Sequence, residues 1–135
     1  MEGVKGLKVF QLSYQQAMDI YNISRTFPKA EVYALTDQIR RSSRSVCANI
    51  AEGYRKRQYP KYFSNKMSDA DAECCETMVW LDFARDCNYI DMQTYSSIYE
   101  TYTKIGKMLG TMQLNPEKFL PKRVSISLKT KNQIL

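Results

Sequence analysis

The chain of 135 residues contains no histidine. This absence removes the commonest general base and the imidazole ligand of most transition-metal sites. A di-iron bundle is excluded as well, because its metal sites use Glu-x-x-His pairs. No serine or cysteine lies beside an evident base in the sequence, and no glycine-rich phosphate loop follows a strand. We therefore expect a protein that is not an enzyme and that carries no cofactor and no metal.

Glycine and proline are also scarce, at five and four residues, which argues against a sheet-rich fold with many turns. Hydrophobic residues make up 44% and charged residues 25%, an ordinary globular composition for one domain. No stretch approaches 18 uncharged apolar residues, and the N-terminus lacks an apolar signal core. We expect a cytoplasmic protein with no membrane association.

The four cysteines are Cys47, Cys74, Cys75 and Cys87, and no pair of them has the C-x-x-C spacing of a zinc or redox site. Adjacent residues on a helix diverge by about 100°, so the side chains of Cys74 and Cys75 are poorly placed for a structural disulfide. We expect free thiols in a reducing compartment.

The apolar pattern predicts four helices, at about 7–25, 29–52, 60–87 and 92–113. The third helix has the clearest period, because its apolar residues alternate steps of four and three: Phe63, Met67, Ala70, Cys74, Thr77, Leu81 and Ala84. Short connections between amphipathic helices indicate an all-α, up-down-up-down antiparallel four-helix bundle over residues 1–114.

The other helices suggest how they pack. In the first helix, a stripe of Phe10, Tyr14, Ala17, Tyr21 and Ser24 is predicted to face the core. In the fourth helix, the predicted core stripe is Tyr95, Tyr99, Tyr102, Ile105 or Gly106, Leu109 and Met112.

Small residues have predicted roles of their own. Ser42 and Ser43 would let a neighbouring helix approach closely, and Gly106 with Gly110 would do the same for the fourth helix. Gly53 is predicted to end the second helix in the left-handed conformation.

The net charge of +6 and the pI of about 9.1 make an anionic partner plausible. Residues 40–61 hold seven of the 20 basic residues against one acid. At the predicted corner after the second helix, cations alternate with aromatic rings. Cations hold phosphates and rings stack on unpaired bases, whereas tyrosines that only pack at the surface would leave the same pattern. The candidate nucleic-acid-binding residues there are Tyr54, Arg55, Lys56, Arg57, Tyr59 and Lys61.

Residues 115–135 carry five basic residues and one acid, a net charge of +4. We expect an extended or disordered basic tail that provides a second contact through Lys122 and Arg123. The segment Val124–Leu128 alternates apolar residues with serine, which is typical of a short strand.

Two oppositely charged stretches offer a structural alternative to binding. Residues 37–61 contain seven basic and two acidic residues, a net charge of +5, whereas residues 69–86 contain one basic and six acidic residues, a net charge of −5. Arg40, Arg41 and Arg44 could pair with Glu73 and Glu76 within the chain. Alternatively, the basic stretch could pair with the acidic stretch of a neighbouring subunit and set its register.

These residues resemble a known family. The stretch Thr26–Lys56, with Phe-Pro, Leu-Thr-x-Gln-x-Arg-Arg and Asn-Ile-Ala-Glu-Gly, is similar to the second-helix motif of proteins encoded in intervening sequences of bacterial 23S rRNA genes. The stretch Ala72–Ile90 is similar to the third-helix pattern of that family. Accessory variability proteins of diversity-generating retroelements are relatives.

The resemblance implies a bacterial, cytoplasmic four-helix bundle assembled as a homopentameric ring, without established catalysis. It implies binding of structured nucleic acid, RNA more than DNA, or, as the alternative, a protein-binding scaffold, for example for a reverse transcriptase, with the basic patch serving inter-subunit pairing. This chain has Ser42 and Ser43 where the family often has alanine. Its matching motif residues are Arg40, Arg41, Asn49, Glu52, Gly53 and Glu76, with Glu73 beside them as a structural residue.

Overall fold

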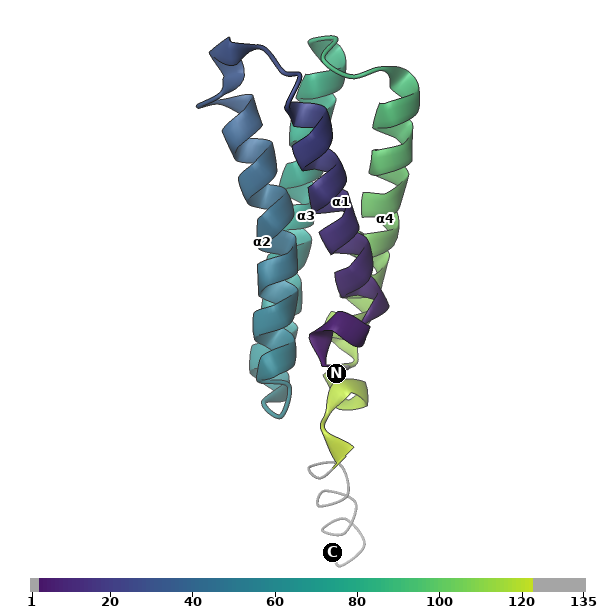
Figure 1. Cartoon of the computed structure of the whole chain (residues 1–135). Helices are drawn as coiled ribbons and strands as arrows, with labels where there is room; N and C mark the ends of the chain where they lie inside the picture. The colour runs from purple at the N-terminus through teal and green to yellow at the C-terminus, as the bar shows by residue number, and fades with distance from the viewer. Residues whose placement is uncertain (1–2, 123–135) are drawn as a thin grey trace, which may run out of the picture.

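The computed structural model describes residues 3–122. Four helices make up most of this part: α1 (Lys8–Ser24), α2 (Leu35–Arg55), α3 (Pro60–Asp86) and α4 (Met92–Leu114) (Figure 1). Short 3-10 turns occur at Val4–Gly6, Lys29–Glu31 and Pro116–Phe119. The described residues contain no strand, so the all-α prediction is confirmed. The strand-like segment Val124–Leu128 and Arg123 lie outside the described residues.

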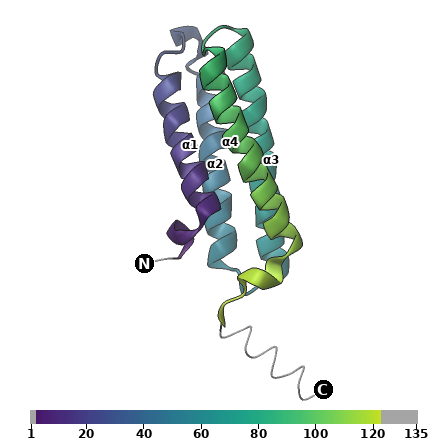
Figure 2. The same ribbon diagram turned by 90° about the vertical axis from the view of Figure 1, so that its right-hand side faces the viewer.

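The four helices lie side by side as one bundle (Figures 1 and 2). The α1–α2 and α3–α4 connections lie at one end, and the α2–α3 turn lies at the other, with the N-terminal turn and the end of α4 (Figure 1). Each helix packs against its neighbours in sequence, and α1 closes against α4. We call the end that contains the α2–α3 turn the basic end.

The core forms around α3. All seven residues of its predicted stripe, from Phe63 to Ala84, are buried. In α4, Tyr102, Ile105 and Leu109 are fully buried in the same cluster. The apolar period therefore predicted the inward face of α3 correctly, whereas in α4 the structure buries Ile98 and leaves the predicted Tyr99 half-buried.

Hydroxyl groups line the contact between α2 and α3. Thr77 donates from its Oγ1 to Ser42 Oγ at 2.8 Å and lies 2.8 Å from the carbonyl of Glu73. Ser42 and Ser43 are both buried. The small side chains therefore allow the close approach that the sequence predicted.

Gly53 has a different role from the predicted one. Helix α2 continues through it to Arg55, and Gly53 does not adopt a positive φ. A Cβ at this position would lie 2.6 Å from Met67 Cε and 2.8 Å from Lys66 Cβ. The glycine is therefore a close-packing residue between α2 and α3, not the end of the helix.

Helix α2 begins at Leu35, later than the predicted start at residue 29. Pro28 is extended, and the backbone of Ala34 departs from helical geometry between the 3-10 turn and the helix. Glu31 joins the start of α2 to the chain that follows α3. Its carboxylate accepts from Leu35 N–H at 3.4 Å and from the Tyr89 hydroxyl at 2.8 Å.

The inward face of α1 also differs from the prediction. Val9, Ser13, Gln16 and Ile20 are buried with Ala17 and Ser24, whereas Tyr14 and Tyr21 are exposed. The aromatic stripe was interpreted as core because it had the right spacing. A second face, one residue away, has the same spacing and combines smaller apolar residues with buried polar ones.

The two helical glycines of α4 do not form the predicted close-packing strip. A Cβ at Gly106 would meet only Asp71 Oδ1, at 3.4 Å, and a Cβ at Gly110 would meet no atom within 4 Å. Gly110 therefore faces open space in the described part of the chain, and the prediction of close packing there is wrong.

Local backbone and capping contacts form the α3–α4 connection. Asn88 has a φ of 61°, the left-handed conformation that ends α3. Tyr89 N–H then donates to the carbonyl of Ala84 at 2.8 Å. Asp91 caps α4 by accepting from Thr94 N–H at 2.7 Å, which lowers the pKa of its carboxyl.

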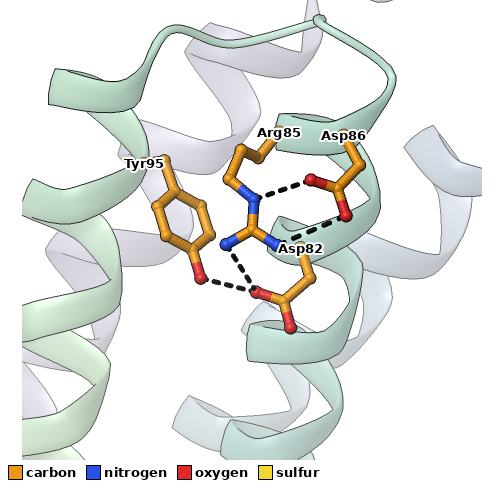
Figure 3. Close-up of polar contacts among 4 residues, drawn as sticks. All are labelled: Asp82, Arg85, Asp86 and Tyr95. Atoms are coloured by element: carbon orange, nitrogen blue, oxygen red, sulfur yellow. Dashed lines mark hydrogen bonds and ion pairs between the residues drawn. The ribbon is translucent and has the colours of Figure 1, made fainter.

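A polar cluster joins the two helices just below this connection (Figure 3). The Tyr95 hydroxyl donates to Asp82 Oδ1 at 2.6 Å, and Arg85 Nε donates to Asp86 Oδ1 at 2.8 Å. The Arg85 guanidinium lies 4.5 Å from the centre of the Tyr95 ring. Burial and the Asp82 bond raise the pKa of Tyr95 to about 12. The acidic residues at this end of α3 therefore have partners within the chain.

The first part of the predicted tail is ordered against the bundle. Phe119, in the turn Pro116–Phe119, stacks on Phe63 with ring centres 5.2 Å apart. Ser64 also donates to the carbonyl of Gln113 at 2.7 Å. The packed body therefore extends past residue 114 to Phe119.

Candidate nucleic-acid interface

The α2–α3 turn is tightly built. Lys56 N–H donates to Gly53 O at 3.2 Å, and Tyr59 N–H donates to Lys56 O at 3.0 Å. Pro60 occupies the first turn of α3, where its fixed φ suits a helix start. The negative end of the α2 dipole favours cations here. The turn therefore presents its basic side chains from a fixed backbone.

Two of the turn's three tyrosine rings are already covered. The Arg57 guanidinium lies 4.1 Å from the Tyr54 ring centre and donates from Nη1 to Tyr54 O at 3.1 Å. Lys56 Nζ lies 5.1 Å from the Tyr62 ring centre. Tyr59 has no such contact among the described residues, and 59% of it is exposed. Tyr59 is therefore the ring best placed to stack on a base.

The basic residues at the turn differ in whether an acidic side chain pairs with them. Lys66 pairs with Glu52 at 3.0 Å, and this bond raises the pKa of Lys66. Within residues 3–122, no acidic side chain lies within 4 Å of Arg55, Lys56 or Lys61, and all three are exposed. The turn therefore carries three exposed positive charges that no acidic side chain of the described residues neutralises.

Folding brings part of the C-terminal segment to the same end. The stack of Phe119 on Phe63 places this segment beside the start of α3. Lys118 and Lys122 are exposed there. Lys122 was singled out from the sequence, whereas Lys118 gains its place only from the packed turn. We call Arg55, Lys56, Lys61, Lys118 and Lys122, with Tyr59, the basic end patch.

The predicted pairing of the α2 arginines with α3 carboxylates is not formed. In the described part of the chain, no ion pair within 4 Å joins Arg40, Arg41 or Arg44 to Glu73 or Glu76. Arg40 instead donates from Nε to Ser24 Oγ at 2.8 Å and lies 4.8 Å from the Tyr21 ring centre.

Burial and neighbouring charges both shift the pKa of Glu73. Burial and the neighbouring Glu76 raise its pKa, and Arg41 lowers it by a smaller amount. The pKa of Glu73 therefore responds more to burial and to Glu76 than to Arg41.

The remaining motif residues have structural contacts. Asn49 donates from Nδ2 to the carbonyl of Ser45 at 2.9 Å, Glu52 holds Lys66, and Gly53 admits α3. These contacts lie inside the bundle or along the α2–α3 contact. The motif residues Asn49, Glu52 and Gly53 therefore contribute to helix structure and helix packing.

A surface hollow that the sequence pattern did not predict lies between α1 and α2. Its volume is about 430 Å³. Arg44 borders it, with its guanidinium 5.9 Å from the Tyr21 ring centre. The stripe of aromatic residues in α1, predicted to face the core, lines this hollow instead. We call this hollow the α1–α2 groove, lined by Phe10, Tyr14, Ala17, Met18, Tyr21, Arg44, Cys47, Ala48 and Ala51.

Residues 3–122 contain no group of three or more carboxylate or thiol side chains placed to hold a metal ion. None of the helices described is both long enough and apolar enough to cross a bilayer.

The fold and the basic end patch define the class of protein: an all-α four-helix bundle with a cationic, aromatic turn at one end. The chain belongs to the 23S rRNA-intervening sequence protein family, whose model matches residues 5–111. A comparison with curated proteins finds no match.

One solved structure is similar over most of this chain. It is the crystal structure, at 1.70 Å resolution, of a protein with unknown function from the S23 ribosomal protein family of Bacteroides thetaiotaomicron VPI-5482. The two sequences are 31% identical, the match covers 78% of this chain and 97% of that chain, and the TM-score is 0.71.

Proposed function

We propose that this protein is a non-enzymatic subunit of a homo-oligomer that binds structured nucleic acid, RNA in preference to DNA. The observation that carries the proposal is the basic end patch. Arg55, Lys56 and Lys61 are exposed cations without acidic partners within 4 Å in the described chain, and the exposed Tyr59 ring lies among them. Cations of this kind neutralise phosphates, and a free ring stacks on an unpaired base.

The oligomer that we propose is a cytoplasmic homopentameric ring of up-down-up-down antiparallel bundles. A ring would gather several copies of one modest patch on one assembly, which raises avidity without any new contact. RNA is the first ligand to test, because the family is named for intervening sequences of 23S rRNA.

The test compares binding of an RNA hairpin and of a DNA duplex at several salt concentrations. We expect the logarithm of affinity to fall linearly with the logarithm of salt, by roughly 0.7–0.9 per phosphate contact. The variant Arg55→Glu/Lys61→Glu should bind more weakly and with a shallower slope. A matched control is Lys29→Glu/Lys104→Glu, which makes the same change in net charge at two exposed lysines outside the patch.

Equal losses in the patch variant and in the control would reduce the effect to overall charge and overturn the site. Affinity that stays flat between about 50 and 200 mM salt would overturn nucleic-acid binding altogether.

A second candidate function is supported by the α1–α2 groove. Its exposed apolar residues Tyr14 and Met18 would suit a protein partner, as in a scaffold for a reverse transcriptase. This function predicts that Tyr14→Ala/Met18→Ala abolishes partner binding and leaves the oligomer intact, whereas loss of the oligomer would assign the groove to contacts between copies.

A further inference from the structure

The α1–α2 groove exposes apolar side chains that a lone bundle would gain by burying. The exposed fractions are 56% for Tyr14, 43% for Met18 and 36% for Tyr21. They lie at steps of four and three residues and so form a continuous stripe along α1. Apolar surface of this kind on a small protein marks an interaction site. Arg44 at its edge adds a positive charge without an acidic partner within 4 Å in residues 3–122.

A complementary surface lies on α3. Val79 and Phe83 are exposed at 44% and 54%, and the exposed carboxylate of Glu76 lies on the same stripe. Within the described chain, Glu76 has no basic partner within 4 Å. We call this surface the α3 ridge, formed by Ala72, Cys75, Glu76, Val79, Phe83 and Asp86.

The contacts between α2 and α3 show which residues lie at equal heights along the bundle. Ser42 bonds to Thr77, and Gly53 lies against Lys66 and Met67, so the two helices run in opposite directions in a fixed register. Arg44 is two residues beyond Ser42, and Glu76 is one residue before Thr77. Their heights therefore differ by about 1.5 Å, the rise of one helical residue.

We propose that the α1–α2 groove receives the α3 ridge of a second copy of this chain. This inference rests on the homo-oligomer in the proposed function and names its interface. Copies around a ring axis that runs along the bundle are related by rotation alone, so residues at equal heights meet between copies. Arg44 of one copy then faces Glu76 of the next, and Val79 covers the apolar groove beside Tyr21.

The charges favour this occupant over nucleic acid. The groove is mainly apolar, with a single cation at its edge, whereas phosphates are held by clusters of cations. The α3 ridge offers both the apolar side chains and the opposite charge. Because each copy carries one groove and one ridge, the contact is head-to-tail and can repeat around a ring.

A charge exchange tests the contact between Arg44 and Glu76. We expect Arg44→Glu and Glu76→Arg each to raise the dissociation constant of the oligomer by about tenfold or more, since each places like charges opposite one another. The double variant Arg44→Glu/Glu76→Arg should restore assembly, because each interface then has an acid facing an arginine again. Lys104→Glu on α4 is the control and should assemble normally. Light scattering across a dilution series measures the dissociation.

The native cysteines provide an independent test. Cys47 lines the groove and Cys75 lies on the ridge, about three residues apart in height, or roughly 4.5 Å. We expect a short bismaleimide to link neighbouring copies of the wild-type protein. Cys47→Ser and Cys75→Ser should each abolish the link, and Cys87→Ser should retain it. The products can be read on a denaturing gel and located by mass spectrometry.

The outcomes separate this inference from the oligomer on which it rests. A protein that remains monomeric at every concentration overturns both. An oligomer in which the two single charge variants assemble normally, or in which the double variant is worse than either single one, overturns the interface and leaves the oligomer standing. A link that survives Cys47→Ser or Cys75→Ser also overturns the interface. Circular dichroism of each variant shows whether the bundle remains folded.

Discussion

Gly53 of α2 faces Met67 of α3 across a space too small for a side chain: a Cβ on Gly53 would lie 2.6 Å from Met67 Cε and 2.8 Å from Lys66 Cβ. The Met67 methyl group can move aside, because it ends a flexible chain. Lys66 Cβ is fixed to the helix, so α3 itself would have to shift. This contact sets the distance between the two helices just above the basic turn.

Gly53→Ala should therefore destabilise the bundle. Overpacking in a close helix contact costs about 1–3 kcal/mol, and alanine returns up to about 1 kcal/mol through its better helix propensity. We expect a net loss of about 1–2 kcal/mol in the free energy of unfolding, measured by urea denaturation.

Gly110→Ala provides the control for this change. Its Cβ would meet no atom within 4 Å, so the propensity gain should appear as a stabilisation of up to about 1 kcal/mol. Equal effects at both glycines would show that propensity alone, not close packing, determines the result at Gly53.

Tyr95→Phe should weaken the α3–α4 junction. It removes the 2.6 Å bond to the ionised Asp82 and keeps the ring beside Arg85. A hydrogen bond to a charged group contributes about 1.5–3 kcal/mol, and this partly exposed pair should lie near the lower value. Thermal unfolding measures the loss. Tyr99→Phe is the control, because the Tyr99 hydroxyl has no bonded partner in the described chain, and an equal loss there would contradict the assigned bond.

Phe119→Ala should release the described start of the C-terminal segment from the bundle. The half-buried ring stacks on Phe63, so its removal should cost about 1–2 kcal/mol, less than the full value for a buried phenylalanine. Limited proteolysis should then cut residues 115–122 faster. Unchanged cutting would show that contacts other than the Phe119–Phe63 stack hold the segment.

Glu73→Gln should change how stability depends on pH. The pKa of Glu73 is raised in the folded state, so the folded chain holds more protons than the unfolded chain above the ordinary value of 4.5. Stability from this group therefore falls as the pH rises from 4.5 through the folded pKa. Replacing the carboxyl should raise the melting temperature at pH 7 and flatten its decline between pH 4.5 and 7. A steeper decline in the variant would contradict this sign.

The sequence predicted the inward face of a helix most accurately where one apolar period ran along the whole helix. The stripe from Phe63 to Ala84 admits only one inward face, and the left-handed Asn88 and the cap at Asp91 follow from local chemistry. The face of α1 was ambiguous, because polar Ser13 and Gln16 alternate with Val9 and Ile20 on the true inner side. An exposed aromatic stripe has the same helical spacing as a buried one, so spacing alone could not distinguish them.

The candidate site was predicted in part. The cations of the α2–α3 turn could be located, because they follow one another in the chain. Their availability could not be predicted, since it depends on contacts such as Arg57 with Tyr54 and Lys66 with Glu52. The place of Lys118 beside the turn depends on Phe119 reaching Phe63, a contact between residues far apart in sequence.

The hydroxyl groups between α2 and α3 bear on how this sequence can diverge. Ser42 and Ser43 contact carbonyl groups within their own helix, at Ile39 and Arg40, and Thr77 contacts that of Glu73. Replacing either serine with alanine would thus orphan no backbone group and leave little empty space. Alanine at Ser43 would therefore cost little, whereas alanine at Ser42 would also remove the interhelical bond from Thr77, and a branched or longer side chain at either position would push the helices apart.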